Sequence, residues 1–122
     1  MTKVGADFDE ECYKNHLTKY STESMYIFGV ESGRSVSEDN DDVKKSNPVN
    51  FVTGKEPPFL FAHGDSDIIV SNSQTLLVHQ KILQKGGKSI RYVLKGDSHG
   101  KGGFDTQDLL NLILQFINDN VL

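Results

Sequence analysis

Residues 57–67 read PPFLFAHGDSD, and this stretch decides the fold of the second half of the chain. Two prolines lead into Phe59-Leu60-Phe61-Ala62, a short apolar run without polar alternation. Such a run is typical of a strand buried on both faces, as in a parallel sheet. The HGDSD that follows has the composition of a loop. We therefore predict a buried strand with a polar loop at its carboxyl end.

The pattern continues toward the C-terminus as helix, strand and helix. Residues 73–85 carry an amphipathic apolar stripe closed by Gly86-Gly87, which predicts a helix. Residues 89–95 alternate apolar and polar side chains and predict a second strand. Asp105 or Thr106 can cap a last helix that runs to about residue 120. This order predicts an α/β fold with short parallel strands, flanking helices and a right-handed crossover.

Residues 1–56 precede that strand and form an acidic, mainly helical segment, whereas residues 57–122 form the α/β portion. Capping-box spacing predicts a helix over residues 8–19. The same spacing at Ser35 and Glu38, with acids leading and lysines trailing, predicts a short helix that ends before Pro48. The apolar run between them, within residues 20–34, is ambiguous.

Composition excludes several classes of function. The chain has 122 residues, enough for one domain, and a formal net charge of −4 without a basic cluster. Nucleic acid and anionic membranes are therefore not expected partners. No apolar run approaches the roughly 20 residues of a membrane span, and the polar N-terminus is not a signal peptide. Cys12 is the single cysteine, so no internal disulfide can form, which suits the cytoplasm.

Two loops at the carboxyl ends of the predicted strands hold the polar residues that could carry chemistry. The first contains His63, Asp65 and Asp67, and the second contains His99. Functional residues of open α/β sheets gather at this edge, and adjacent parallel strands place such loops side by side. A carboxylate from the first loop could then orient an imidazole from the second, which is the acid–base pair of a serine hydrolase.

The motifs NPVNFVTGKEPPFLFAHGDSDIIVSNSQ and YVLKGDSHG resemble the C-terminal portion of the α/β-hydrolase esterase and lipase family. The resemblance covers residues 46–122 and is greatest to the branch that acts on small carboxylic esters or acylated sugars. The family's H-G-D-x-D-x-x-V motif implies that Asp67 is the triad acid, and its Gly-x-x-His loop implies that His99 is the triad base. Ser71 stands where the family often has proline, and Asp97 and Ser98 depart from its usual histidine loop. Neither departure removes a catalytic side chain.

The position of the nucleophile is the main open question. The family's chain order is serine, acid, histidine, so the resemblance implies a nucleophile and an oxyanion-hole loop upstream of residue 1. Residues 96–100, GDSHG, do match the G-x-S-x-G elbow. However, Ser98 is adjacent to His99 in the chain and is therefore poorly placed to hydrogen-bond its ring. A nucleophile elbow also needs a helix directly after the serine, and none is expected there. Finally, no histidine follows His99 in the sequence. We expect a C-terminal fragment of a serine esterase that is inactive alone.

The polar residues of the two loops also allow other interpretations. Asp67 could instead cap the following helix, although Ser71 or Ser73 is better placed to do so. Asp65 is expected to be structural, and His63 to hydrogen-bond within the strand end. The side chains of the two loops lack the spacing of a metal site, so no metal or organic cofactor is expected. The side chains concerned are His63, Asp65, Asp67 and His99.

Two rival functions remain. One is a non-catalytic remnant or a binding and oligomerisation module, and the other is a small enzyme that uses Ser98. The expected partners are a small ester substrate and, through an uncovered sheet edge, either a missing N-terminal half or a second copy.

Overall fold

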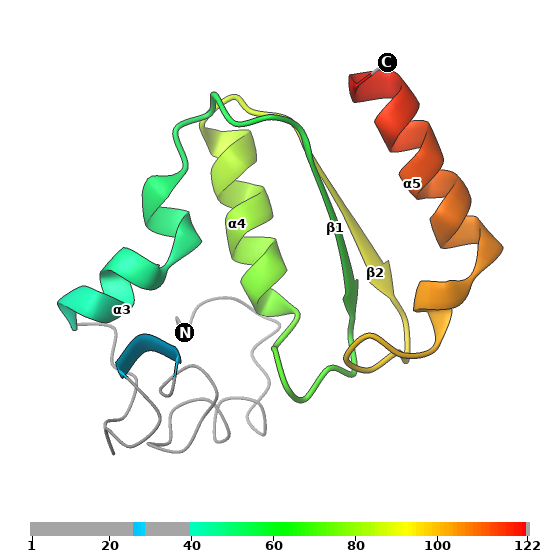
Figure 1. Ribbon diagram of the computed structural model, residues 1–122, viewed down its shortest axis with the longest axis horizontal. Helices are drawn as coiled ribbons and strands as arrows, with labels where there is room; N and C mark the ends of the chain where they lie inside the picture. The colour runs from blue at the N-terminus through cyan, green and yellow to red at the C-terminus, as the bar shows by residue number, and fades with distance from the viewer. Residues whose placement is uncertain (1–25, 29–39, 122) are drawn as a thin grey trace.

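The computed structural model describes residues 26–28 and 40–121 (Figure 1). Residues 26–28 are helical. The predicted helix over residues 8–19 and the proposed cap at Ser35 lie outside the described residues. The remaining elements, in chain order, are α3 (Asp41–Ser46), the 3₁₀ helix η1 (Pro48–Phe51), β1 (Phe59–Gly64), α4 (Ser73–Gln84), β2 (Ser89–Leu94), the 3₁₀ helix η2 (Gly103–Asp105) and α5 (Gln107–Asn120).

The two described strands form a parallel sheet, as the sequence predicts. β1 pairs with β2 in a register that runs from Phe59 opposite Ser89 to Gly64 opposite Leu94. The crossover between them is α4, which packs against both strands. Figure 1 shows α4 on one side of the sheet and α5 on the other, with the carboxyl ends of both strands at the same edge. The loops that follow β1 and β2 therefore start side by side.

Local signals at the helix ends explain why the predicted boundaries of α4 and α5 hold closely. The amide of Gly87 bonds to the Ile82 carbonyl at 2.9 Å, and that of Gly86 to the Leu83 carbonyl at 3.0 Å. These two bonds make a Schellman motif, which needs a left-handed residue, and Gly86 has a φ of 83°. Thr106, not Asp105, caps α5 by accepting from the Leu109 amide at 3.4 Å.

The first turns of α3 and α4 differ from the prediction. Asn40 caps α3 by accepting from the Asp42 and Val43 amides, so the short helix begins later than the Ser35 spacing indicates. It carries acids first and lysines last, and it ends before Pro48, as expected. The N-cap of α4 is Asn72, whose side chain makes no capping bond. Neither Ser71 nor Ser73 is therefore the N-cap of α4, although Ser71 Oγ accepts from the Ser73 amide at 3.4 Å and lies 2.9 Å from Ser73 Oγ.

β1 is not buried on both faces as expected: Phe59 is 37% exposed, and only His63 and Gly64 of the strand are fully buried. The neighbouring strand is also open on one face. Polar Ser89 and Arg91 of β2 lie on the face that packs against α4, as their bonds to His79 and Thr75 show. Alternation then puts Ile90 on the opposite face, where it is 45% exposed. Among the described residues the buried apolar side chains are few: Val43, Ile82, Leu94 and Leu109.

The outward side of α5 is also apolar. Leu110, Ile113, Leu114 and Ile117 are each at least 36% exposed. One side of the sheet and one face of α5 therefore present apolar surface to solvent. None of the described helices is both long and apolar enough to cross a membrane.

Candidate functional site

The loops after β1 and β2 are joined by hydrogen bonds before either reaches its functional residue. The Asp65 amide donates to the Leu94 carbonyl at 3.1 Å, and the Ser66 amide donates to the Asp97 carbonyl at 3.0 Å. The Asp65 carboxylate in turn accepts from the Gly96 amide at 2.6 Å. This confirms the expected structural role of Asp65. We call residues 65–72, after β1, the acid loop and residues 95–102, after β2, the histidine loop. Three hydrogen bonds thus fix these two loops to each other.

Gly64 permits this close approach. A Cβ at this position would lie 2.2 Å from the carbonyl oxygen of Asp97, far inside van der Waals contact. Because that oxygen belongs to the backbone, no side-chain movement could relieve the clash. The glycine of the HGDSD motif is therefore required by the contact between the two loops.

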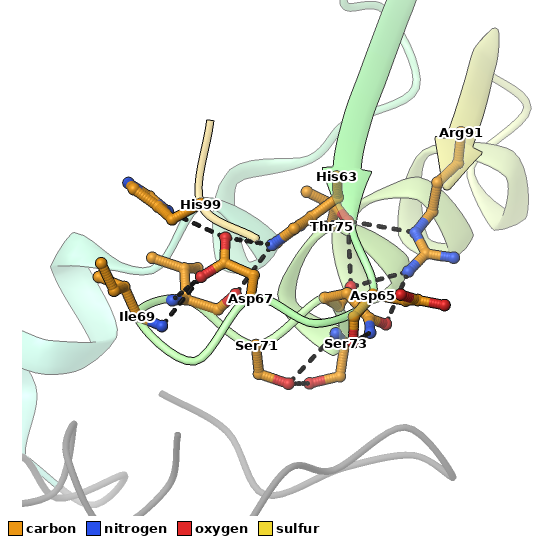
Figure 2. Close-up of polar contacts among 11 residues, drawn as sticks. His63, Asp65, Asp67, Ile69, Ser71, Ser73, Thr75, Arg91 and His99 are labelled. Carbon is orange, nitrogen blue, oxygen red and sulfur yellow. Dashed lines mark hydrogen bonds and ion pairs between the residues drawn. The ribbon is translucent and has the colours of Figure 1, made fainter. Parts of the chain in front are cut away.

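Asp67 lies at the centre of the site and has polar contacts at both of its carboxylate oxygens (Figure 2). Its Oδ1 accepts from the Ile69 amide at 2.9 Å and from the Val70 amide at 2.8 Å. Its Oδ2 lies 2.9 Å from Nδ1 of His99 and 3.3 Å from Nε2 of His63. The amides of Ile69 and Val70 belong to the acid loop itself, so Asp67 does not cap α4. The carboxylate closes its own turn and faces two imidazoles.

The environment of Asp67 keeps it ionised. Its side chain is only 4% exposed, and burial by itself would raise the pKa of the carboxyl group. Hydrogen bonds from the Val70 amide, His99 and the Ile69 amide outweigh that effect, so the pKa lies below its ordinary value. A buried carboxylate that stays charged at neutral pH can orient an imidazole and stabilise its protonated form.

His99 is held by one side-chain bond and is otherwise open. Its side chain is 53% exposed, and Nδ1 faces Asp67 Oδ2 at 2.9 Å. Because an ionised carboxylate only accepts hydrogen bonds, Nδ1 carries the hydrogen and the lone pair of the neutral ring lies on Nε2. Nε2 makes no hydrogen bond to any part of the chain that the structure describes. This arrangement leaves a general base available to take a proton.

Asp97 shapes the histidine loop, and the sequence analysis did not identify this role. Its Oδ2 accepts from the Gly103 amide at 2.5 Å. Gly102 has a φ of 85°, and a Cβ there would lie 2.2 Å from Asp97 Oδ1. The glycine pair that follows His99 in the sequence was the available signal, since paired glycines mark a close approach of the backbone. Asp97 therefore closes the loop between residues 97 and 103.

The structure also tests the elbow pattern around Ser98. No helix begins directly after this serine: η2 starts at Gly103 and α5 at Gln107. Within the described ranges Ser98 makes no hydrogen bond to His99. The G-x-S-x-G match therefore lacks the strand–turn–helix context of a nucleophile elbow. Cys12, the single cysteine, lies outside the described residues.

A pocket borders the acid loop at Val70. Its volume is about 240 Å³, and its lining comprises Ile27, Val43, Ser46, Asn47, Pro48, Val70 and Gln74. In the described part of the chain, no group of three or more histidine, cysteine, aspartate or glutamate side chains is placed to hold a metal ion.

The fold and the site define a class of protein. Two parallel strands joined by a helix, with an acid after the first and a histidine after the second, correspond to part of an α/β hydrolase. The sequence model of the BD-FAE family, an α/β-hydrolase-type esterase family, matches residues 6–82. The chain belongs to this family. The resemblance to the C-terminal portion of such esterases is thereby confirmed.

A solved structure agrees with the family assignment. It is described as a truncated form of a carbohydrate esterase from gut microbiota, and it superimposes with a TM-score of 0.61 at 30% sequence identity. The match covers 71% of this chain and 32% of the solved chain. The present chain thus spans about a third of the length of that structure. No curated protein matches the chain significantly.

Proposed function

We propose that this chain supplies the acid and the general base of a serine carboxylic-ester hydrolase. The observation that carries the proposal is the 2.9 Å contact between a buried, ionised Asp67 and Nδ1 of a solvent-accessible His99. In this mechanism Nε2 of His99 removes the proton from a serine hydroxyl as the serine attacks the ester carbonyl. Asp67 fixes the tautomer and stabilises the imidazolium. His99 then protonates the leaving alcohol, and water releases the acid product.

We propose further that the nucleophilic serine and the oxyanion-hole donors come from a segment other than the described loops. Ser98 lacks the required geometry, and the Ser71 hydroxyl bonds to Ser73. The loss of one oxyanion-hole donor alone slows such enzymes by about 10²–10³-fold. Without a nucleophile and these donors, the pair is expected to turn over no ester. The family and the solved carbohydrate esterase support an ester of a sugar as the substrate class.

The first test is labelling of the purified 122-residue protein with a fluorophosphonate, followed by peptide mass spectrometry. We expect no adduct on a folded sample. An adduct on Ser98 that is lost in Ser98→Ala would overturn the assignment of the nucleophile. It would instead favour a self-sufficient enzyme.

The second test supplies Asp67 and His99 with a nucleophilic serine and oxyanion-hole donors from another esterase. The segment of the solved carbohydrate esterase that matches this chain is replaced by this chain, and hydrolysis of an acetylated sugar is measured. We expect activity that Asp67→Asn or His99→Gln lowers by about 10³–10⁴-fold. Asp108→Asn, which alters an exposed carboxylate of α5, is the matched control and should be neutral. A folded but inactive hybrid would favour a non-catalytic remnant.

We also propose that the chain associates through its apolar side, either with a complementary segment that completes the sheet or with a second copy. Ile90 on β2 and the exposed leucines of α5 support this, and a two-stranded sheet is marginal alone. Multi-angle light scattering checks it. A monodisperse, stable monomer would contradict the proposal.

A further inference from the structure

A line of polar side chains runs behind Asp67, on the side away from His99 (Figure 2). Arg91 Nε donates to Thr75 Oγ1 at 3.1 Å, and that hydroxyl lies 2.9 Å from Nδ1 of His63. Nε2 of His63 then faces Asp67 Oδ2 at 3.3 Å. The members come from β2, α4 and β1 in turn. Side chains from three separate elements thus form a chain of contacts that ends at Asp67 Oδ2.

His63 is the member in contact with Asp67, and its hydrogen can be placed by elimination. The residue is 6% exposed. Nε2 lies 2.8 Å from the Val70 carbonyl oxygen as well as 3.3 Å from Asp67 Oδ2. Both of these atoms only accept hydrogen bonds, so Nε2 must carry the hydrogen, which it donates to the Val70 carbonyl while Asp67 Oδ2 lies 3.3 Å away. His63 is therefore bonded to the backbone of the loop that carries Asp67 and lies against the carboxylate.

Thr75 and Arg91 fix the other side of this ring. The Thr75 hydroxyl has one hydrogen and lies within reach of both His63 Nδ1 and the Asn72 carbonyl, which is at 3.0 Å. Arg91 Nη2 donates to the same carbonyl at 2.8 Å, so this oxygen has a hydrogen-bond donor even when the threonine hydroxyl points elsewhere. The hydroxyl can then donate to Nδ1 while it accepts from Arg91 Nε. In this arrangement both ring nitrogens have partners and the ring cannot rotate freely.

We propose that His63 is a positioning residue for the acid–base pair. It holds Asp67 Oδ2 toward His99, and it acts through Asp67 without touching the substrate. The inference rests on the proposed function of Asp67 and His99. Without His63, Oδ2 would have only the half-exposed imidazole as a side-chain partner, and water would compete for that bond. His99 would then lose part of the bias that keeps its hydrogen on Nδ1.

The test is ¹⁵N NMR of the imidazole rings in the 122-residue protein, which reports the tautomer of His99 directly. We compare His63→Phe, which keeps a ring but removes both nitrogens, with the wild type. We expect the ratio of Nδ1–H to Nε2–H tautomers of His99 to fall by about three- to tenfold, the equivalent of one lost hydrogen bond. His79→Phe is the matched control: His79 is also bonded on α4, to Ser89 at 2.8 Å, but lies outside this line. It should leave His99 unchanged.

Thr75→Val provides a milder variant if His63→Phe does not fold. It removes the hydroxyl and keeps the shape, and we expect a smaller change in the same direction. An unchanged His99 tautomer in the folded variants would overturn the role of His63 and leave the proposed function standing. A wild-type His99 without the Nδ1–H preference would contradict the pair itself, and therefore both proposals. A role in stability alone would lower the midpoint of unfolding without moving the tautomer ratio.

Discussion

The acid loop and the histidine loop share one edge of the sheet but are built in opposite ways. Asp67 is 4% exposed, accepts from two backbone amides and from His99, and has His63 Nε2 at 3.3 Å. In contrast, the side chain of His99 is 53% exposed and bonds only to Asp67 among the described residues. The orientation of the pair is therefore determined from the acid side. The histidine keeps one nitrogen open, which the proposed proton transfer requires. Rigidity and access are divided between two loops instead of being combined in one.

The contact between the loops should be the most sensitive point of this arrangement. Gly64→Ala places a methyl group 2.2 Å from the Asp97 carbonyl oxygen, so the loops must separate. We expect a loss of about 2–4 kcal/mol in the free energy of unfolding, measured with urea. Gly96→Ala is the control: its φ of 79° strains alanine, but its Cβ would meet no atom within 4 Å. It should cost about 1–2 kcal/mol. Equal losses would show that the loops do not depend on this contact.

Asp67→Asn should come next in size and should depend on pH. The amide nitrogen of asparagine would face two N–H groups, which costs about 1–3 kcal/mol at pH 7. Because the folded pKa of Asp67 lies below its ordinary value, its charge stabilises the fold above about pH 4. That contribution is lost as the pH falls through the folded pKa. The difference in the free energy of unfolding between wild type and variant should therefore narrow as the pH falls below about 4 in urea titrations. A difference independent of pH would contradict this.

His99→Gln should have the smallest effect on stability. The ring is half exposed and makes one side-chain bond, so we expect a change within about 0.5–1 kcal/mol. The same substitution should lower hydrolysis by the hybrid esterase about 10³–10⁴-fold. Thermal unfolding and the activity of the hybrid, measured on the same variants, check the contrast with Asp67→Asn. A large loss of stability would show that the histidine loop is as rigid as the acid loop.

Much of this fold could be predicted because its signals are local. The Gly86-Gly87 motif ends α4, Thr106 caps α5, and the apolar run from Phe59 marks β1; each depends on residues close in the chain. These features need no knowledge of how distant segments pack. The pairing of Asp67 with His99, by contrast, was indicated by the resemblance to esterases.

The remainder depends on contacts that span the chain. Arg91 reaches Thr75 from a different element, and alternation in β2 could not show that its polar side chains would face α4 while Ile90 stayed exposed. Asn72 took the N-cap of α4 in place of a serine because Ser71 and Ser73 bond to each other. Sequence patterns give the period of a strand but do not tell which face meets a helix.

The bonds that join the two loops have a practical consequence for protein engineering. Two of them, from the Asp65 and Ser66 amides, link main chain to main chain and use no side chain at all. The side chains of Ser98 and Lys101 take no part in these bonds, whereas Ser66 Oγ donates to the Asp65 carboxylate at 3.3 Å. A combinatorial library at positions 98 and 101 can therefore vary the residues on either side of His99 and Gly100 while the bonds that join the two loops are kept.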